Sequence, residues 1–364
     1  MTTPLAATRP SVHAVLPGAV DDPARPSGGN TYDRRAAAAL AAAGWQVCVA
    51  AVPGGWPDPD RAALDGLAAA LGVVPDGAWV LVDGLVGCAA PGVLAAVAGR
   101  VRVALLVHLP LADETGTDPG RAADRDARER AALHAAAVVI ATSTATAAAL
   151  IARHGLDPRR VRVAAPGVDP APPAPGSATG TRLLCVASVT PRKGHDVLVE
   201  ALGRLAVPQW ECVCVGPGEA DPGFAVTVRA RAAALGLPPR LRFVGPLTGA
   251  DLAARYAAAD LLVLPSRAEP YGMVVTEALA RAVPVLASDV DGLPEALGRA
   301  PDGTVPGVLV PPGDPAALAA ALDRWLTDPA LGRRLRAAAA ARRPLLRGWD
   351  ATAADLATAL AGAR

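Results

Sequence analysis

The chain has few aromatic residues, no long apolar run and no apolar segment at its start. Phe, Trp and Tyr make up 3% of its 364 residues, against 52% hydrophobic residues overall, so we expect cores of Ala, Leu and Val. No stretch comes near the roughly 18 uninterrupted apolar residues of a membrane-spanning helix. Met1–Pro10 lacks the apolar centre of a signal peptide. We therefore expect a cytoplasmic protein without membrane association.

The charge of the chain is balanced and its cysteines are scattered. Its 35 basic and 34 acidic residues are spread throughout, whereas a nucleic-acid surface needs a clustered basic excess, so we expect no nucleic-acid partner. Five cysteines, mostly in apolar strand-like runs, favour buried free thiols over disulfides. Cys212 and Cys214 would share one strand face, but no further ligand lies near them in the sequence, so we expect no metal site.

Short apolar runs alternate with Ala-rich helical stretches, such as Tyr32–Ala43 and Ala145–His154, along the whole chain. This alternation predicts an α/β fold with doubly wound parallel sheets. The pattern occurs twice, on either side of residues 170–180, whose four prolines and lack of apolar periodicity indicate a linker. The expected strands are His13–Leu16, Gln46–Val52, Trp79–Val82, Val101–His108, Ala137–Thr142 and Val161–Ala165, then Leu183–Ala187, Glu211–Val215, Leu241–Val244, Leu261–Leu264, Val285–Ser288 and Val308–Val310.

This organisation predicts two Rossmann-like domains, residues 1–170 and 181–346, followed by a further helix over residues 350–364. Two such domains face each other across a cleft at the carboxyl ends of their strands. Ligands of this architecture bind in that cleft.

The stretch 265–277 carries the strongest functional signal, because Glu269 and Glu277 flank a glycine turn between a strand and a helix. The turn should aim the N–H groups of Gly272 to Val274 at the sheet edge, where a helix N-terminus favours phosphate. Glu277 then suits a vicinal diol such as a ribose, and Glu269 a polar, uncharged part of the ligand. These contacts together predict a nucleotide sugar. The alternative is two solvated surface glutamates.

The same stretch resembles the signature of the retaining nucleotide-sugar glycosyltransferases of the GT-B group, family 4. The matching positions are Pro265, Ser266, Glu269, Gly272, Glu277 and Ala278. The resemblance implies a GT-B fold with an acceptor-side first domain, a donor-binding second domain and a C-terminal helix that packs back on the first domain. It implies a nucleoside-diphosphate-sugar donor, retention of anomeric configuration and no metal or other cofactor.

Arg192 and Lys193 lie between the first strand and first helix of the second half, where two cations can hold a diphosphate. The alternative is a solvated basic pair. The segment resembles the family's Gly-Arg-Leu-x-x-x-Lys-Gly loop, with Lys193 and Gly194 in register. Ser188 stands where the family has its arginine, so Arg192 is the candidate for that role.

In the first half, a loop with Ser27-Gly28-Gly29-Asn30 precedes the helix expected from Tyr32, and His108 ends a central strand. Paired glycines let a backbone approach a ligand closely. The alternatives are an ordinary flexible loop and a histidine satisfied in the core. The family resemblance implies that Gly28 and Asn30 face the acceptor, Gly29 the donor, and His108 the transferred sugar, without making it a general base.

Four further residues complete the donor site that the resemblance implies. Leu247 lies in the loop that holds the base, and Tyr271, Met273 and Val274 lie on the phosphate turn. Two other patterns are set aside. Asp289-Val-Asp291 spells an Asp-x-Asp metal motif of a different transferase fold, and Gly216-Pro-Gly218 lacks the third glycine of an NAD site because position 221 is aspartate.

We therefore expect a retaining, metal-independent glycosyltransferase acting on a small-molecule acceptor, with Glu269, His108 and Lys193 as catalytic residues. One rival is a GT-B epimerase or hydrolase, which would carry additional acids in the first domain. The other is a non-catalytic nucleotide-sugar-binding protein, favoured only by Ser188 and by Asp291, which replaces the first glycine of a Gly-Gly-x-x-Glu turn ending at Glu295.

Overall fold

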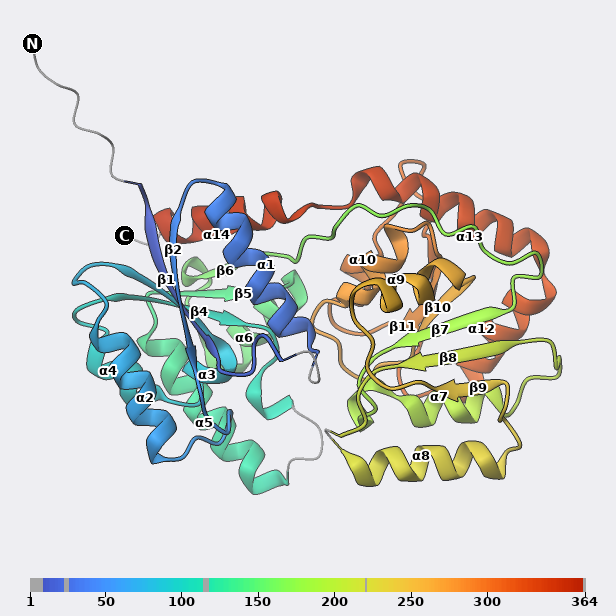
Figure 1. Cartoon of the computed structure of the whole chain (residues 1–364), viewed down its shortest axis with the longest axis horizontal. Coiled ribbons are helices and arrows are strands. Elements are labelled where there is room, and N and C mark those ends of the chain that lie inside the picture. The colour runs from blue at the N-terminus through green and yellow to red at the C-terminus, as the bar shows by residue number, and fades with distance from the viewer. Residues whose placement is uncertain (1–8, 23–25, 114–117, 220, 363–364) are drawn as a thin grey trace, which may run out of the picture.

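The structure is a computed structural model that describes residues 9–22, 26–113, 118–219 and 221–362. It contains two six-stranded sheets flanked by helices and lying side by side (Figure 1). The strand order is β2-β1-β3-β4-β5-β6 in the first domain and β12-β11-β10-β7-β8-β9 in the second. Neighbouring strands pair in parallel in both sheets. The α/β, doubly wound prediction is confirmed.

Every expected strand is present, and the bounds differ by at most two residues at either end because short Val- and Leu-rich runs define them. The first sheet contains β1 (Ser11–Pro17), β2 (Gln46–Val52), β3 (Trp79–Asp83), β4 (Arg102–Val107), β5 (Val138–Ala141) and β6 (Val161–Val163). The second contains β7 (Arg182–Val186), β8 (Glu211–Val215), β9 (Leu241–Phe243), β10 (Leu261–Leu264), β11 (Val285–Ser288) and β12 (Gly307–Val310).

The helices connect these strands and cover the sheets. Those of the first domain are α1 (Gly28–Ala42), α2 (Arg61–Gly72), α3 (Gly84–Gly87), α4 (Pro91–Val97), α5 (Pro119–Ala135) and α6 (Thr144–His154). Next come α7 (His195–Leu202), α8 (Pro222–Ala234), α9 (Gly249–Ala258), α10 (Met273–Leu279), α11 (Leu293–Leu297), α12 (Pro315–Thr327), α13 (Pro329–Arg342) and α14 (Trp349–Gly362). Within the described residues, no helix has both the length and the apolarity needed to cross a membrane.

One helix begins earlier than the sequence indicates. We expected Gly28, Gly29 and Asn30 in a loop before Tyr32, but they form the first turn of α1. The side chain of Ser27 caps this turn by accepting a hydrogen bond of 3.0 Å from the N–H of Asn30. The N–H of Asn30 has no acceptor within the helix, so the cap stabilises the first turn and offsets the low helix propensity of the two glycines.

Each sheet reverses its winding at one point, and that point decides where ligands bind. In the first domain β1 lies between β2 and β3, and in the second β7 lies between β8 and β10. The loops that follow the two central strands leave toward opposite faces there, which opens a crevice at the carboxyl edge. The first-domain crevice lies at the ends of β1 and β3, and the second-domain crevice at the ends of β7 and β10.

Two segments cross between the domains next to each other, at the top of Figure 1. The linker after β6 passes the segment between α13 and α14, and the N–H of Val168 donates to the carbonyl of Arg347 at 2.9 Å. Beyond this point the linker lies on the second domain, where the N–H of Ser177 donates to Asp260 at 2.7 Å. The returning helix α14 packs on α1, with Leu356 and Leu360 fully buried in the first-domain core.

Candidate active site

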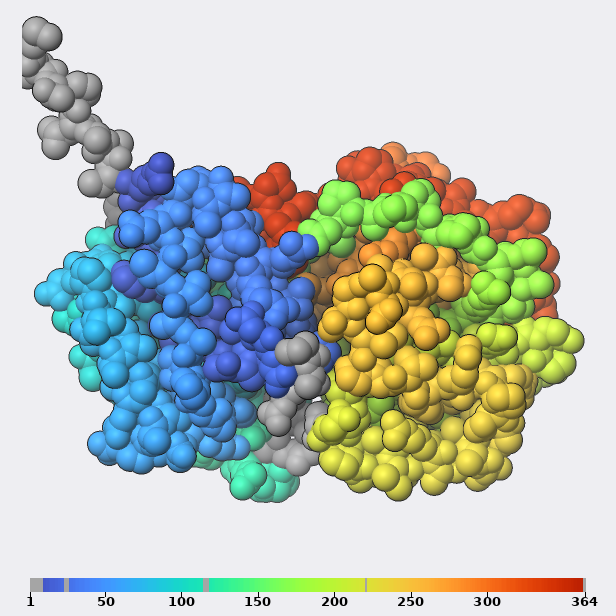
Figure 2. All heavy atoms as spheres, in the orientation of Figure 1, coloured from blue at the N-terminus to red at the C-terminus, as the bar shows by residue number. Residues whose placement is uncertain are grey.

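A cleft of about 420 Å³ lies between the carboxyl edges of the two sheets and is lined by both domains. The domains, blue and yellow to orange, face each other across the middle of the molecule in Figure 2. Every residue singled out for the site from the sequence lines this one cleft. They are Gly28, Gly29, Asn30 and His108 from the first domain, and Arg192, Lys193, Leu247, Glu269, Tyr271, Gly272, Met273, Val274 and Glu277 from the second.

Glu269 lies in the loop between β10 and α10, with its carboxylate bonded on two sides. Its Oε2 atom forms an ion pair with Lys193 Nζ and accepts a hydrogen bond of 3.1 Å from the hydroxyl of Ser266. Burial raises the pKa of Glu269, but the charges of Lys193 and Arg192 outweigh burial and bring that pKa below its ordinary value. The residue therefore presents a carboxylate at neutral pH, held in one position.

The loop that carries Lys193 is fixed against the Glu269 loop by its backbone. Gly194 has a φ of +69°, and a β-carbon there would lie 2.0 Å from the carbonyl oxygen of Pro265, so only glycine fits. The N–H of Arg267 also donates to the carbonyl of Arg192 at 2.7 Å. The cations after β7 and the glutamate after β10 are thus held as one unit.

Asp291, the departure from the family's glycine, stabilises the same unit. Its φ is +46°, a region that favours glycine and, among other residues, aspartate and asparagine. Its Oδ2 accepts a hydrogen bond of 2.8 Å from the backbone N–H of Glu269. The replacement therefore keeps the backbone shape that glycine provides and adds a contact to Glu269.

Glu277 lies in α10 on the other side of the turn and is half-buried. Its Oε2 accepts a hydrogen bond of 2.7 Å from the hydroxyl of Tyr256, and the Arg281 guanidinium lies 4.8 Å from the centre of the Tyr256 ring. Burial raises the pKa of Glu277, which the hydrogen bond from Tyr256 and the charge of Arg281 only partly offset. Tyr256 thus binds one carboxylate oxygen of Glu277, Oε2, and the hydrogen bond does not involve the second oxygen, Oε1.

His108 is part of a buried charged cluster that sequence reasoning missed. Its Nε2 atom lies 2.8 Å from Asp33 Oδ1, on α1, and 3.4 Å from Asp83 Oδ2, at the end of β3. Both aspartates are nearly inaccessible, and Asp33 Oδ2 has no hydrogen-bond partner among the described residues. The position of Asp83 at a strand's carboxyl end was a signal that could have identified it. Gly29 lies against the imidazole, since a β-carbon there would lie 3.3 Å from it.

The cluster holds its protons tightly. Burial opposes the charge on His108, but Asp33 and then Asp83 outweigh burial and raise the pKa of His108. Burial and the charge of Asp33 raise the pKa of Asp83 to about 8. The ligand atoms of the three residues lie within 4.8 Å of one another, so a cation could also compensate their charge.

These shifts predict that the protein is less stable at pH 8 than at pH 5. In the unfolded chain Asp83 releases its proton near 3.8, whereas in the folded chain it keeps it to about 8. The folded state therefore binds more protons across this range, and the free energy of unfolding falls as the pH rises, as it also does for the raised pKa of His108. We expect a smaller fall of Tm in Asp83→Asn, which can still cap the N–H of Leu85. Equal pH dependence of Tm in both proteins would contradict the assignment.

The two sides of the cleft also contact each other directly. Glu295, the last residue of the turn that begins at Asp291, accepts hydrogen bonds from the N–H and the hydroxyl of Thr144 at the start of α6. The hydroxyl of Thr146 donates to the carbonyl of Pro270 at 3.3 Å. These contacts hold the glutamate turn of the second domain against the first domain.

Comparison with known proteins agrees with this geometry. The family model described as Glycosyl transferases group 1 matches residues 174–342, and the model Glycosyltransferase Family 4 matches residues 79–172. The chain belongs to the family 4 glycosyltransferases. The solved sucrose-phosphate synthase of Thermosynechococcus elongatus superposes with a TM-score of 0.77 and 25% identity, over 97% of this chain and 99% of that one. The GT-B fold is confirmed.

Other similar proteins are more distant or match in part. A structure of Anabaena HepE in complex with UDP and glucose has a TM-score of 0.75 over 97% of this chain and 100% of that one, at 18% identity, and shares the fold. A D-inositol 3-phosphate glycosyltransferase of Salinispora tropica is 37% identical over 243 residues, 60% of this chain and 49% of the relative. That of Kineococcus radiotolerans is 35% identical over 274 residues, 69% and 62% respectively. The matches thus span about half to three fifths of these relatives' length.

Proposed function

We propose that the protein transfers a sugar from a nucleoside-diphosphate sugar to a hydroxyl of a small-molecule acceptor, with retention of anomeric configuration and without a metal ion in the transfer step. The observation that carries this proposal is the placement of Glu269 and Glu277 on either side of one turn in the interdomain cleft, with Glu269 held against Lys193. Family membership supports the reaction class. Retention rests on the family resemblance.

The donor would lie along the second-domain side of the cleft. Glu277 binds the ribose diol through the oxygen that Tyr256 does not occupy, and Leu247 contacts the base. The first N–H groups of α10, at Gly272, Met273 and Val274, bind the diphosphate together with Arg192 and Lys193. Helix-terminal N–H groups and fixed cations stabilise the charge that develops on a leaving phosphate.

The transferred sugar would lie between Glu269 and His108, one from each domain. Both side chains are held by buried partners before any ligand binds, so the reacting groups are oriented in advance. A ligand enclosed between the two domains is shielded from water, which strengthens the electrostatic contacts to the sugar and phosphate. This division of roles explains why the site draws on both sheets.

The absence of a metal from the transfer step is supported by the position of Asp291. Its carboxylate is engaged with the backbone of Glu269, so Asp289-Val-Asp291 does not present a pair of carboxylates to the donor phosphates. Arg192 and Lys193 supply positive charge at the phosphate position instead. If a divalent cation did take part in transfer, the cluster of His108, Asp33 and Asp83 could bind it. Activity measured with a chelator tests this possibility.

The function is tested by thermal shift with UDP, GDP, ADP and TDP, each with magnesium and with chelator, followed by transfer assays with the nucleotide sugar of the best base. We expect one nucleotide to raise Tm equally in both conditions, and the increase to disappear in Glu277→Ala. A dependence on magnesium would contradict the metal-free step. Nucleotide binding without transfer to any hydroxylated acceptor would favour the non-catalytic alternative, for which Ser188 is the remaining argument.

The acceptor is expected to be uncharged. Among the described residues that line the cleft, Arg192 and Lys193 are the only Arg and Lys, and both belong to the donor side. The acceptor side presents His108, whose positive charge is already paired with Asp33, so it offers a phosphate group no unpaired cation.

We therefore expect myo-inositol or another neutral polyol to be used at least about tenfold better, in kcat/KM, than its monophosphate, since a phosphate group that finds no unpaired cation in the cleft is disfavoured by about 1.4 kcal/mol or more. Competition between the two acceptors in one reaction measures the ratio. Arg25 precedes the cleft residue Pro26 in the sequence and lies outside the described residues, so Arg25→Ala tests whether this arginine binds a phosphate group of the acceptor. Preference for the phosphorylated acceptor that depends on Arg25 would contradict the prediction.

A further inference from the structure

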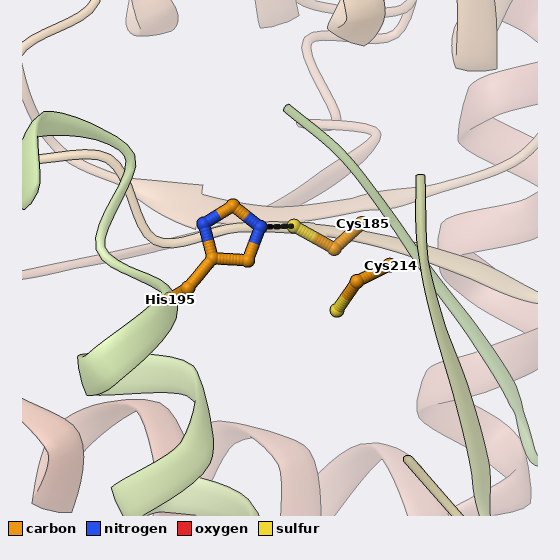
Figure 3. A group of neighbouring side chains, drawn as sticks. All are labelled: Cys185, His195 and Cys214. Atoms are coloured by element: carbon orange, nitrogen blue, oxygen red, sulfur yellow. Dashed lines mark hydrogen bonds between the residues drawn. The ribbon is translucent and has the colours of Figure 1, made fainter. Parts of the chain in front are cut away.

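The core of the second domain contains a group of soft ligand atoms apart from the cleft. Cys185 on β7 and Cys214 on β8 are directly opposite in the parallel register. His195 is the first residue of α7, and Figure 3 shows its imidazole pointing at the sulfur of Cys185 with the Cys214 side chain beside it. The Nε2 to Sγ distance is 3.7 Å, and all three ligand atoms lie within 4.8 Å of one another.

The surroundings of this group are dry and apolar. Cys185 and His195 have no exposed surface and Cys214 has 2%. The other ring nitrogen of His195, Nδ1, is buried and has no hydrogen-bond partner among the described residues. A polar ring in an apolar core costs free energy unless its nitrogen atoms are bound, and the sulfur at 3.7 Å is a weak hydrogen-bond partner. The histidine is therefore poorly explained as a packing residue.

The spacing of the ligand atoms fits a tetrahedral ion. Zn–S bonds of about 2.3 Å and Zn–N bonds of about 2.0 Å place sulfur and nitrogen roughly 3.5 Å apart, close to the 3.7 Å between Cys185 and His195. Cys212 is also fully buried and lies two residues before Cys214, on the same strand face, where the two thiols interact. Its sulfur lies outside the group of atoms within 4.8 Å of one another, so Cys212 would act as the fourth ligand after a change of its side-chain rotamer.

We propose that Cys185, Cys214, His195 and Cys212 form a structural zinc site in the second-domain core. Three thiolates and one neutral imidazole are a ligand set of structural zinc sites, and with Zn²⁺ they make a centre of one net negative charge. Binding requires the thiols to lose their protons, which leave to solvent as the ion enters. The sulfur atoms keep their oxidation state.

The site connects to the donor cleft through the chain. His195 follows Gly194 and Lys193 directly, so an ion bound to the first residue of α7 fixes the start of that helix to strands β7 and β8. The ligand residues themselves do not line the cleft. The ion would therefore stabilise the phosphate-binding loop without contacting donor or acceptor.

Metal uptake by the whole protein tests the proposal. The reduced, chelator-treated chain is titrated with Co²⁺, whose thiolate charge-transfer absorption and intense visible bands report tetrahedral sulfur coordination, and is then challenged with Zn²⁺. We expect one equivalent to bind, Zn²⁺ to displace it, and Tm to increase with either ion. Cys185→Ala and Cys214→Ala should lose the equivalent, whereas Cys48→Ala, at an exposed thiol of the first domain, should keep it.

The wild-type protein alone can overturn the inference if an alanine variant fails to fold. Absence of a stoichiometric Co²⁺ complex in the folded wild type would refute the site, as would bands that persist unchanged in Cys185→Ala or that Cys48→Ala removes. Binding of Cu⁺ without Co²⁺ or Zn²⁺ would refute zinc as the ion. None of these readouts uses nucleotide or acceptor, so failure here leaves the proposed transfer reaction separately testable.

Discussion

Replacing Glu269 with glutamine should slow sugar transfer by about 100- to 1000-fold, the range found when one stabilising group of a transition state is removed. Glutamine keeps the size of the side chain and can still accept from Ser266, but it loses the charge that holds Lys193. Nucleotide affinity should change by less than about threefold, because the proposed diphosphate and ribose contacts remain.

Steady-state kinetics and nucleotide titration of the same preparation separate the two effects. The matched control is Glu211→Gln, which changes an exposed glutamate at the start of β8. We expect its kcat to equal that of the wild type. If Glu269→Gln lost binding and transfer in equal proportion, its carboxylate would serve nucleotide binding and not the transfer step.

Replacing Glu277 with alanine should weaken nucleotide binding by about 10- to 100-fold, the loss expected for hydrogen bonds to a charged group. The raised pKa of Glu277 adds a pH signature, because a diol donates to the ionised carboxylate. Affinity should therefore begin to fall at a higher pH than an ordinary glutamate would give as the solution is acidified. Glu277→Gln should remove that dependence.

A 2′-deoxynucleotide tests the proposed contact between Glu277 and the ribose most directly. In the wild type it should bind more weakly than the ribonucleotide, and in Glu277→Ala the two should bind alike, because the hydroxyl has lost its partner. Tyr256→Phe is the control, since it removes the hydroxyl that contacts Glu277 but keeps the carboxylate. A full deoxy penalty in Glu277→Ala would place the ribose elsewhere.

Much of the fold could be predicted because its signals are local. Val- and Leu-rich runs such as Leu261–Leu264 mark buried parallel strands, and the strands in turn place the residues after β7 and β10 at one edge. The position of these residues at one sheet edge, together with the family motif at 265–277, was enough to predict which residues line the cleft. The start of α1 was missed because it depends on one capping hydrogen bond, which the side chain of Ser27 accepts from the N–H of Asn30.

The parts that the sequence did not predict depend on contacts between distant positions. Asp33 reaches His108 from 75 residues away, and His195 meets cysteines from two different strands. Glu129 on α5 is likewise fully buried against His154, which lies 25 residues further along the chain at 3.1 Å. Periodicity identifies which face of an element is apolar, but it does not indicate which buried polar residues find each other.

Because of the double crossing at the top of the molecule, a cut in the linker alone divides the chain but not the core of the first domain. A chain divided between Pro172 and Pro173, both exposed, would leave α14 covalently attached to the second domain while its apolar face belongs to the first-domain core. The apolar face of α14, formed by Leu356, Leu360 and Trp349, would then bind the first-domain fragment to the second. The two pieces should recombine into an assembled cleft when expressed together, which makes the enzyme suitable for split-protein complementation.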